Sequence, residues 1–384
     1  MSFSHFFRIP SPVFEGSGCS KILPLRLVES GVKRVVLVMD SNVQKTPWGE
    51  SLKLEIEGQI ASVEVWSNVK PNVPSYLVQL LADKLHEACP EAIVAVGGGS
   101  TMDLAKAGVA VYETGLSIYD LLAGKWVGTS NLMPIYAVPT TCGSGSEGSP
   151  FAVVLLEEER IKRGFRQDAL VPKEVYLDSE ALTSLPDDYV AATGIDACCH
   201  AIETYLSIKA STFNDCSVLG AVLSSFTNIP AAVQGDITAR SALLAASFSS
   251  RLMSSGVGLS IAHAISHPLG ARTGLHHGKA VAVGIIPSLR LNLPYTQGKM
   301  ATLARYLVPW CPTRTNDAAE AFIEHFEALL LTLPLKIPAM VLDDEQVCDI
   351  AELSLQSSNI ASNPAPVDLR TTLRLVSEAI AWSQ

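Results

Sequence analysis

The chain has 384 residues, of which 48% are hydrophobic and 17% charged, a balance typical of a soluble globular protein with large buried cores. The length predicts two or three domains. The formal net charge of −10 argues against a nucleic-acid-binding surface, because such a surface needs an excess of Lys and Arg. A small anionic ligand would need only two or three local cations.

We expect no targeting or membrane segment. The first ten residues, MSFSHFFRIP, lack the basic and apolar regions of a secretory signal peptide. The longest uncharged run, residues 252–271, contains His, Ser and Gly, and it predicts a buried helix rather than a membrane span. The eight cysteines show no C-x-x-C spacing and are too few for a disulfide framework. We therefore expect reduced thiols, a cytoplasmic location, and neither a membrane nor a nucleic acid as partner.

Apolar runs and helical patterns alternate through the first half of the chain. The apolar runs cover residues 34–40, 92–100, 134–141, 151–156 and 174–178. Helical patterns lie between the first three, at residues 76–88 and 101–113. Continuous apolar strands that alternate with helices indicate a parallel sheet covered on both faces. The segment 151–165, FAVVLLEEERIKRGF, predicts instead a hairpin with its charged residues at the turn.

The composition changes near residue 178. Beyond it, long helical stretches rich in Ala, Leu and Ser, broken by Pro and Gly, replace the apolar strands. We therefore predict an α/β domain at residues 1–180 and an all-helical domain at residues 181–384.

Two glycine-rich loops follow predicted strands. VGGGSTMDLAKA (residues 96–107) opens a helix, and its glycines and free N–H groups favour close approach of an anion such as pyrophosphate. VPTTCGSGSEGSP (residues 138–150) is a second polar loop after a strand. Each could be an ordinary turn or loop. Two such loops at the carboxyl ends of parallel strands favour a nucleotide site.

Two aspartates near these loops have more than one interpretation. Asp40 ends the first of the strands, where a carboxylate could accept hydrogen bonds from ribose hydroxyls and would repel a 2′-phosphate. It could equally cap a turn or a helix. Asp103 could simply stabilise the first turn of its helix.

Histidines are concentrated in the predicted helical domain. Asp196 and His200 are four residues apart, as are His263 and His267, and His277 follows after a turn. A spacing of four places both members of a pair on one helix face. One Asp and three neutral imidazoles would form a site for Fe(II) or Zn(II) with an open position. These are five candidates for four ligands, so one of the three later histidines would lie near the metal without binding it.

Glu203 lies one further turn along the helix from His200 and could contact a ligand without binding the metal itself. His276, next to His277, is expected to have a structural or surface role.

The motifs resemble those of the iron-type (group III) metal-dependent alcohol dehydrogenases over essentially the whole chain. The matching segments are GGGSTMDLAK, VPTTCGSGSE, LTSLPDDYVAATGIDACCHAIETYLS, GLSIAHAISHPLGARTGLHHGKAVAVGIIP and SNPAPVD. The resemblance implies a Rossmann-like dinucleotide-binding domain (residues 1–180) and a helical metal-binding domain (residues 181–384), as in the dehydroquinate-synthase-like architecture. It also implies a homodimer that interconverts a short-chain primary alcohol and its aldehyde.

The same resemblance assigns roles to individual residues. One divalent metal, Fe(II) or Zn(II), would bind Asp196, His200, His263 and His277, which leaves His267 as the catalytic residue beside the reacting carbon. NAD(H) is the implied cofactor, with Asp40 at the position associated with NAD rather than NADP. The implied cofactor-binding residues are Asp40, Gly97, Gly98, Gly99, Ser100, Asp103, Thr140, Thr141, Ser144, Lys162 and Leu182.

The chain departs from the family pattern near the expected substrate. Gly148 and Ser149 stand where Val-Thr is commoner, followed by Phe151. Arg272 and Lys279 flank His277, where many relatives carry apolar residues. Because Arg binds carboxylate, sulfonate or phosphonate groups in a planar fork, we hypothesise an aldehyde with an anionic tail. The alternative is that both cations face solvent.

Two other functions compete with the dehydrogenase. A dehydroquinate-synthase-like lyase would also use NAD and a metal, but a Glu is expected there in place of Asp196. A non-catalytic metal-binding scaffold is the third possibility. The intact Asp and His set together with the intact glycine loop favours the dehydrogenase.

Overall fold

The computed structural model describes residues 11–127 and 132–382. Within them the chain forms two compact units that meet in sequence between Leu185 and Pro186. We call the first the α/β unit and the second the helical unit.

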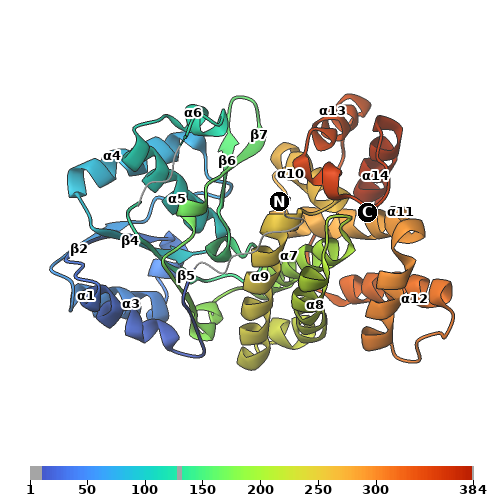
Figure 1. Ribbon diagram of the computed structural model, residues 1–384, viewed down its shortest axis with the longest axis horizontal. Helices are drawn as coiled ribbons and strands as arrows, with labels where there is room; N and C mark the ends of the chain where they lie inside the picture. The colour runs from blue at the N-terminus through green and yellow to red at the C-terminus, as the bar shows by residue number, and fades with distance from the viewer. Residues whose placement is uncertain (1–10, 128–131, 383–384) are drawn as a thin grey trace, which may run out of the picture. The chain divides into compact units, whose positions relative to one another are not determined.

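The α/β unit is built on a parallel six-stranded sheet with the order β1-β8-β5-β4-β2-β3 (Figure 1). Its strands are β1 (Val13–Glu15), β2 (Arg34–Met39), β3 (Ser62–Trp66), β4 (Ala92–Gly97), β5 (Ile135–Pro139) and β8 (Glu174–Leu177). The predicted parallel sheet is confirmed, and four of the predicted apolar runs lie in β2, β4, β5 and β8. Strands β1 and β3 were not predicted.

Helices cover both faces of this sheet. The helices of the unit are α1 (Leu23–Glu29), α2 (Ser41–Gln44), α3 (Pro47–Glu57), α4 (Ser75–Ala88), α5 (Gly99–Thr114) and α6 (Ile118–Leu122), with 3-10 turns η1 (Cys19–Ile22), η2 (Ser146–Gly148), η3 (Asp168–Leu170) and η4 (Ser179–Leu182). Figure 1 shows α1 and α3 on one face and α4 and α5 on the other. Leu37 of β2 packs with Leu27 of α1 and Ile56 of α3 in one buried cluster. Continuous apolar strands are therefore needed, because both faces of the sheet are buried.

The predicted hairpin is confirmed. Strands β6 (Phe151–Leu156) and β7 (Ile161–Arg166) pair antiparallel in a separate two-stranded sheet. Residues 157–160, EEER, form the turn, where the charged side chains reach solvent.

The described part of the second half is mostly helical, as predicted. Its elements are α7 (Asp187–Leu206), α8 (Thr212–Val233), α9 (Ile237–Val257), α10 (Ile261–Thr273), α11 (His277–Leu307), α12 (Thr315–Thr332), α13 (Asp344–Leu355), η5 (Ser358–Ser362) and α14 (Leu369–Ala381). A buried cluster joins α10, α11, α13 and α14 through residues such as Ile265, Val283, Ile350 and Leu375. Prolines do not always end these helices, since Pro287 and Pro294 lie inside α11.

Two predictions about apolar segments need correction or comment. Residues 252–271 form not one helix but the end of α9 and most of α10, separated at Gly258, whose φ of +83° an L-residue rarely adopts. By length and composition alone, α8 could cross a membrane, a test that core helices also pass. Val218, Val222 and Ile229 of α8 are fully buried, although only 39% of its apolar window is buried.

Candidate active site

The carboxyl ends of β2 and β4 form the point where the strand order of the main sheet reverses. Strand β2 has β3 on one side and β4 on the other. Asp40 directly follows β2 and donates its backbone N–H to Val96 O of β4 at 3.2 Å, next to Gly97. Open α/β sheets bind ligands at such a switch point. The predicted cofactor residues at this edge therefore lie where a dinucleotide is expected.

The glycines of the first loop allow the second loop to pack against it. Gly98 is the N-cap of α5 and Gly99 its first residue. A Cβ atom would lie 3.0 Å from Thr141 Cγ2 at Gly98 and 2.6 Å from Ser144 Oγ at Gly99. Thr140 donates its N–H to Gly97 O at 3.0 Å. The glycines thus serve loop packing, and they also leave the start of α5 without a capping side chain, as anion binding requires.

Four of the predicted polar cofactor residues accept hydrogen bonds from backbone N–H groups, and one of them is Ser144, which accepts from Ser146 N at 3.3 Å. Asp40 accepts a hydrogen bond from Asn42 N at 2.8 Å and caps α2, which was the alternative interpretation. Ser100 Oγ accepts from Asn72 N at 3.2 Å. Asp103 accepts from Val153 N at 3.2 Å, and from Ser146 Oγ at 2.5 Å. Asp103 therefore holds the second loop and β6 rather than only its own helix turn.

The other predicted residues of this unit lie on the hairpin and after β8. Lys162 is partly buried on β7, and Leu182 is fully buried in η4. Phe151 begins β6, and its ring centroid lies 5.6 Å from the guanidinium of Arg166.

Lys106 is a functional candidate that the sequence analysis missed. Its side chain is fully buried on α5, and Nζ donates to Ser146 O, Ser149 O and Phe151 O at 2.5, 2.7 and 3.0 Å. The ammonium group of Lys106 thus binds several carbonyl oxygens of the second loop and the start of β6. A signal was present, since Lys106 is a lone cation in the apolar stretch LAKAGVAV.

Replacing Lys106 by Met should lower the free energy of unfolding by at least about 3 kcal/mol, because several buried acceptors lose their donor and each costs about 1–3 kcal/mol. Chemical denaturation measures this. Lys125→Met is the matched control, because Lys125 is 64% exposed and pairs with Asp120. We expect that control to lose about 1 kcal/mol or less. Similar losses in the two variants would contradict a special role for Lys106.

In the helical unit, α7 presents three buried polar side chains along one face. Asp196 and His200 are 3% and 4% exposed, and Glu203 follows one turn later at 2%. Almost every residue of α7 from Val190 onward is buried. Polar groups at such positions need partners, because burial without them is costly.

The side chains on α10 and α11 meet those on α7. Asp196 Oδ1 lies 3.4 Å from His263 Nε2, 3.7 Å from His277 Nε2 and 3.8 Å from His200 Nδ1. The rings of His200 and His263 stack with centroids 4.4 Å apart. Three helices thus bring three predicted histidine ligands around one oxygen of the fourth, Asp196.

This arrangement fits a divalent metal. Ligand atoms of Asp196, His263 and His277 all lie within 4.8 Å of one another. Nitrogen and oxygen ligands at about 2.0–2.1 Å from a tetrahedral metal are about 3.4 Å apart, close to the distances found here. Asp196 Oδ1 and His263 Nε2 are buried and make no hydrogen bond of normal geometry. An ion with borderline N/O preference would satisfy both atoms.

The electrostatics of the cluster favour a cation. Burial raises the pKa of Asp196, but the imidazoles of His200, His277 and His263 outweigh burial and hold that pKa below its ordinary value. Burial lowers the pKa of His263, yet Glu203 and Asp196 raise it to about 9. The carboxylates therefore attract positive charge into a buried site.

Glu203 contacts a predicted ligand, as expected. Its Oε2 pairs with His263 Nδ1, and its Oε1 accepts from Ser260 Oγ.

Gly278 is a second residue whose role the sequence did not reveal. It follows His277 in the first turn of α11, and a Cβ atom there would overlap Ala192 O of α7. Only a residue without a side chain lets α11 approach α7 closely enough to bring His277 to Asp196.

His267 lies beside the cluster on α10, and its ring centroid is 5.2 Å from that of His277. It is partly buried. His276 occupies the N-cap position of α11 without a capping hydrogen bond from its side chain, and it packs edge-on against Tyr189 with centroids 5.1 Å apart, which agrees with a structural role.

Arg272 and Lys279 both form ion pairs within the helical unit. Arg272 Nε lies 2.6 Å from Asp349 Oδ2, and Lys279 Nζ lies 3.2 Å from Asp188 Oδ2. Their side chains are 20% and 12% exposed, so neither is a freely solvated cation. Sequence spacing gave no sign of the two aspartates, which come from α13 and α7.

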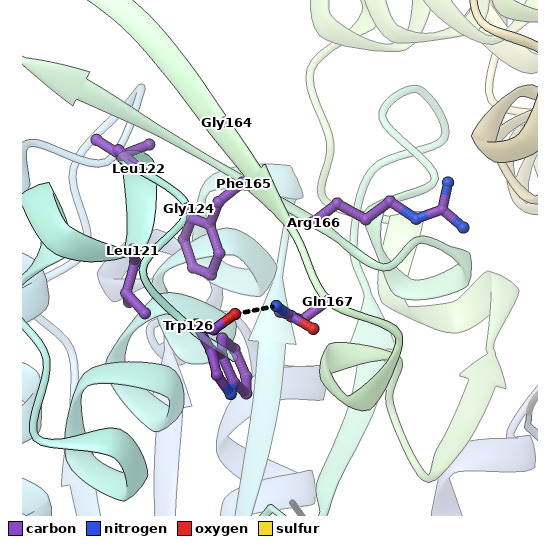
Figure 2. Close-up of a pocket in the computed structure, with 8 residues that line it drawn as sticks. All are labelled: Leu121, Leu122, Gly124, Trp126, Gly164, Phe165, Arg166 and Gln167. Carbon is purple, nitrogen blue, oxygen red and sulfur yellow. Dashed lines mark hydrogen bonds between the residues drawn. The ribbon is translucent and has the colours of Figure 1, made fainter. Parts of the chain in front are cut away.

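A separate cavity of about 180 Å³ lies between α6 and β7 in the α/β unit (Figure 2). Gln167 Nε2 donates to Trp126 O at 3.3 Å at its edge, and Phe165 faces it. The residues that line it are Leu121, Leu122, Gly124, Trp126, Gly164, Phe165, Arg166 and Gln167. None of them belongs to the predicted sites.

Family models match both halves of the chain. Residues 10–179 match the family described as iron-containing alcohol dehydrogenase. Residues 190–380 match the C-terminal part of the same family.

Curated relatives agree with this family. A 4-hydroxybutyrate dehydrogenase of Cupriavidus necator is 34% identical over 72% of this chain and 74% of its own length. A choline dehydrogenase of Bacillus subtilis is 30% identical over 83% and 81%. An NAD-dependent methanol dehydrogenase of Bacillus methanolicus is 27% identical over 98% and 100%. The chain belongs to the iron-containing alcohol dehydrogenase family and is an NAD-dependent alcohol oxidoreductase that uses a metal.

Proposed function

We propose that Asp196, His200, His263 and His277 hold one divalent metal, Fe(II) or Zn(II), and that the enzyme interconverts a short-chain primary alcohol and its aldehyde. The observation that carries the proposal is the convergence of three imidazoles on Asp196 Oδ1, at 3.4–3.8 Å. A bound metal would act as a Lewis acid on the substrate oxygen. One Asp and three His accept either ion, so availability decides between them.

Other residues of the chain would transfer the proton and bind the cofactor. His267, next to His277, would take or relay the proton of the substrate hydroxyl. Residues 1–180 would bind NAD(H), with Asp40 at the switch point accepting from the ribose and disfavouring a 2′-phosphate. Gly97, Gly98, Gly99 and Ser100 would receive the pyrophosphate at the start of α5. Asp103, Thr140, Thr141, Ser144, Lys162 and Leu182 would complete the cofactor site. Residues 181–384 would form the metal-binding domain of a cytoplasmic homodimer.

We propose a substrate with an anionic tail as the second candidate. The named substrates of two relatives have opposite charges, since 4-hydroxybutyrate carries a carboxylate and choline a quaternary ammonium. Arg272 and Lys279 favour the anion. Each is already paired with an aspartate, so an anionic tail would have to compete with Asp349 or Asp188. Phe151 would contribute an apolar wall.

The function is tested by NADH oxidation with enzyme loaded anaerobically with Fe(II) or Zn(II). We expect turnover of butanal that a chelator abolishes and added metal restores. Metal-loaded enzyme that binds NADH but reduces no aldehyde would contradict the proposal.

The same assay with succinic semialdehyde, which has the same chain length as butanal, tests the anionic tail. We expect kcat/KM for succinic semialdehyde to exceed that for butanal by about 100-fold or more, equivalent to about 2.7 kcal/mol. We also expect Arg272→Ala or Lys279→Ala to remove this preference. Both results together would support an anionic substrate. Equal values for the two aldehydes would leave a neutral short-chain substrate.

A further inference from the structure

Helix α10, which carries His263, begins without a cap of its own. Its N-cap residue, Ser260, makes no capping hydrogen bond to the helix. Side chains from distant parts of the chain bind the first N–H groups instead. Asn363 Oδ1 accepts from Ile261 N at 3.2 Å, and Glu203 Oε1 accepts from His263 N at 3.4 Å. The start of α10 is thus held from α7 and from the segment SNPAPVD.

Asn363 binds the backbone of α10 and also binds α11. It exchanges amide hydrogen bonds with Asn292 of α11 at 3.0 and 3.1 Å, and Asn292 Oδ1 also accepts from Ala365 N at 2.9 Å. This buried amide pair ties the start of α10 to α11, the helix that carries His277. It explains a motif near the C-terminus that the metal and cofactor sites do not use.

Glu203 acts on the ring of His263 as well as on the backbone. Its carboxylate is 2% exposed, and it accepts from Ser260 Oγ and from His263 N through Oε1 while Oε2 faces His263 Nδ1. An ionised carboxylate only accepts hydrogen bonds, so Nδ1 must carry the ring proton. When His263 is neutral, as a metal ligand must be, its lone pair is then on Nε2, which lies 3.4 Å from Asp196 Oδ1.

We propose that Glu203 is a positioning residue that fixes both the tautomer and the location of His263, so that Nε2 alone is presented to the metal. This rests on the proposed metal site. Glu203 therefore has two roles. It accepts a hydrogen bond from the uncapped start of α10, and it orients His263, the ligand in the same helix turn. Such carboxylate–histidine pairs raise the basicity of a metal ligand.

Glu203→Gln separates the capping of α10 from the orientation of the His263 ring. The Gln carbonyl can still accept from His263 N and Ser260 Oγ, whereas its amide nitrogen cannot accept from Nδ1–H. We expect the affinity for Zn(II), measured by competition with a chromophoric chelator, to fall about 10–100-fold. The visible absorption spectrum of the Co(II)-substituted protein should change, and the Tm of the metal-free protein should stay close to that of the wild type.

Glu174→Gln is the matched control. Glu174 is also a 2% exposed carboxylate, but it lies in the α/β unit and binds Arg26 and Tyr176. We expect that change to lower the Tm and leave Zn(II) affinity unchanged. If Glu203→Gln does not fold, Glu203→Asp keeps the charge but shortens the reach to Nδ1, and it should show the same loss of affinity.

Zn(II) affinity and a Co(II) spectrum equal to those of the wild type, in Glu203→Gln or in a folded Glu203→Asp, would overturn the inference. The wild type separates this outcome from failure of the metal site itself. A wild-type protein that binds neither ion would refute the proposed metal site, whereas tight binding by wild type and variant alike would refute only the role of Glu203.

Discussion

Asp196→Asn should lower the affinity for Zn(II) by about 1,000-fold or more, and kcat/KM should fall at least as far. Loss of a residue outside the ligand set costs about 10–100-fold, so loss of the central anionic ligand should exceed that. Asn has nearly the shape of Asp, but it lacks the charge that balances the cation. Oδ1 of Asp196 is the atom on which three imidazoles converge, which is why this position should be the most sensitive of the four.

The measurements are chelator competition for the metal and initial rates of NADH oxidation at saturating metal. Asp215→Asn is the control, because Asp215 lies in the same unit, is 31% exposed and pairs with Lys299. We expect that change to alter neither quantity. An Asp196→Asn protein that keeps its Zn(II) affinity within about threefold would refute the assignment of Asp196 as a ligand.

Gly278→Ala should destabilise the protein and weaken the metal site together. The added methyl group would overlap Ala192 O, and a backbone atom cannot turn aside as a flexible side chain could. Overpacking in a dense core costs about 1–3 kcal/mol, and we expect the upper end of that range. Helix α11 must move away from α7, so His277 would leave Asp196 and Zn(II) affinity should fall by about tenfold or more.

Gly298→Ala is the control in the same helix, at a glycine where an added methyl group meets no other atom. Gly298 is exposed on α11, and nothing lies within 4 Å of a Cβ atom there. Ala is favoured over Gly in a helix by up to about 1 kcal/mol, so this variant should be slightly stabilised. Thermal unfolding and chelator competition on both variants test the pair. A Gly278→Ala protein that gains stability like Gly298→Ala would show that α11 does not need its close approach to α7.

Local sequence was sufficient for elements whose burial leaves a strong pattern. Strands β2, β4 and β5 are buried on both faces and therefore appear as continuous apolar runs. Strand β3 was missed because it lies at the edge of the sheet, is only half-buried and carries Glu64 at its centre. Strand β1 was missed because three residues carry no periodicity.

The sequence also predicted which candidate ligands share a helix face, but not which of them meet around one metal. A spacing of four places Asp196 with His200, and His263 with His267, on one helix face. That spacing cannot say which faces of α7, α10 and α11 meet, and so residue pattern alone left five candidates for four positions. The resemblance to the dehydrogenases chose among them, and the packing brings His277 Nε2 within 3.7 Å of Asp196 Oδ1.

The sequence by itself determined the family, the two structural classes, the glycine loops and the identity of the candidate ligands, because each of these leaves a local pattern. Tertiary structure alone decided the partners that join distant segments. It placed Glu203 against His263 and Asn363 at the start of α10. It also placed the ammonium of Lys106, which is on α5, against the carbonyls of the second loop, and aspartates beside Arg272 and Lys279. Hydrogen bonds and ion pairs of this kind depend on the docking of elements far apart in the chain, and no spacing along the sequence encodes them.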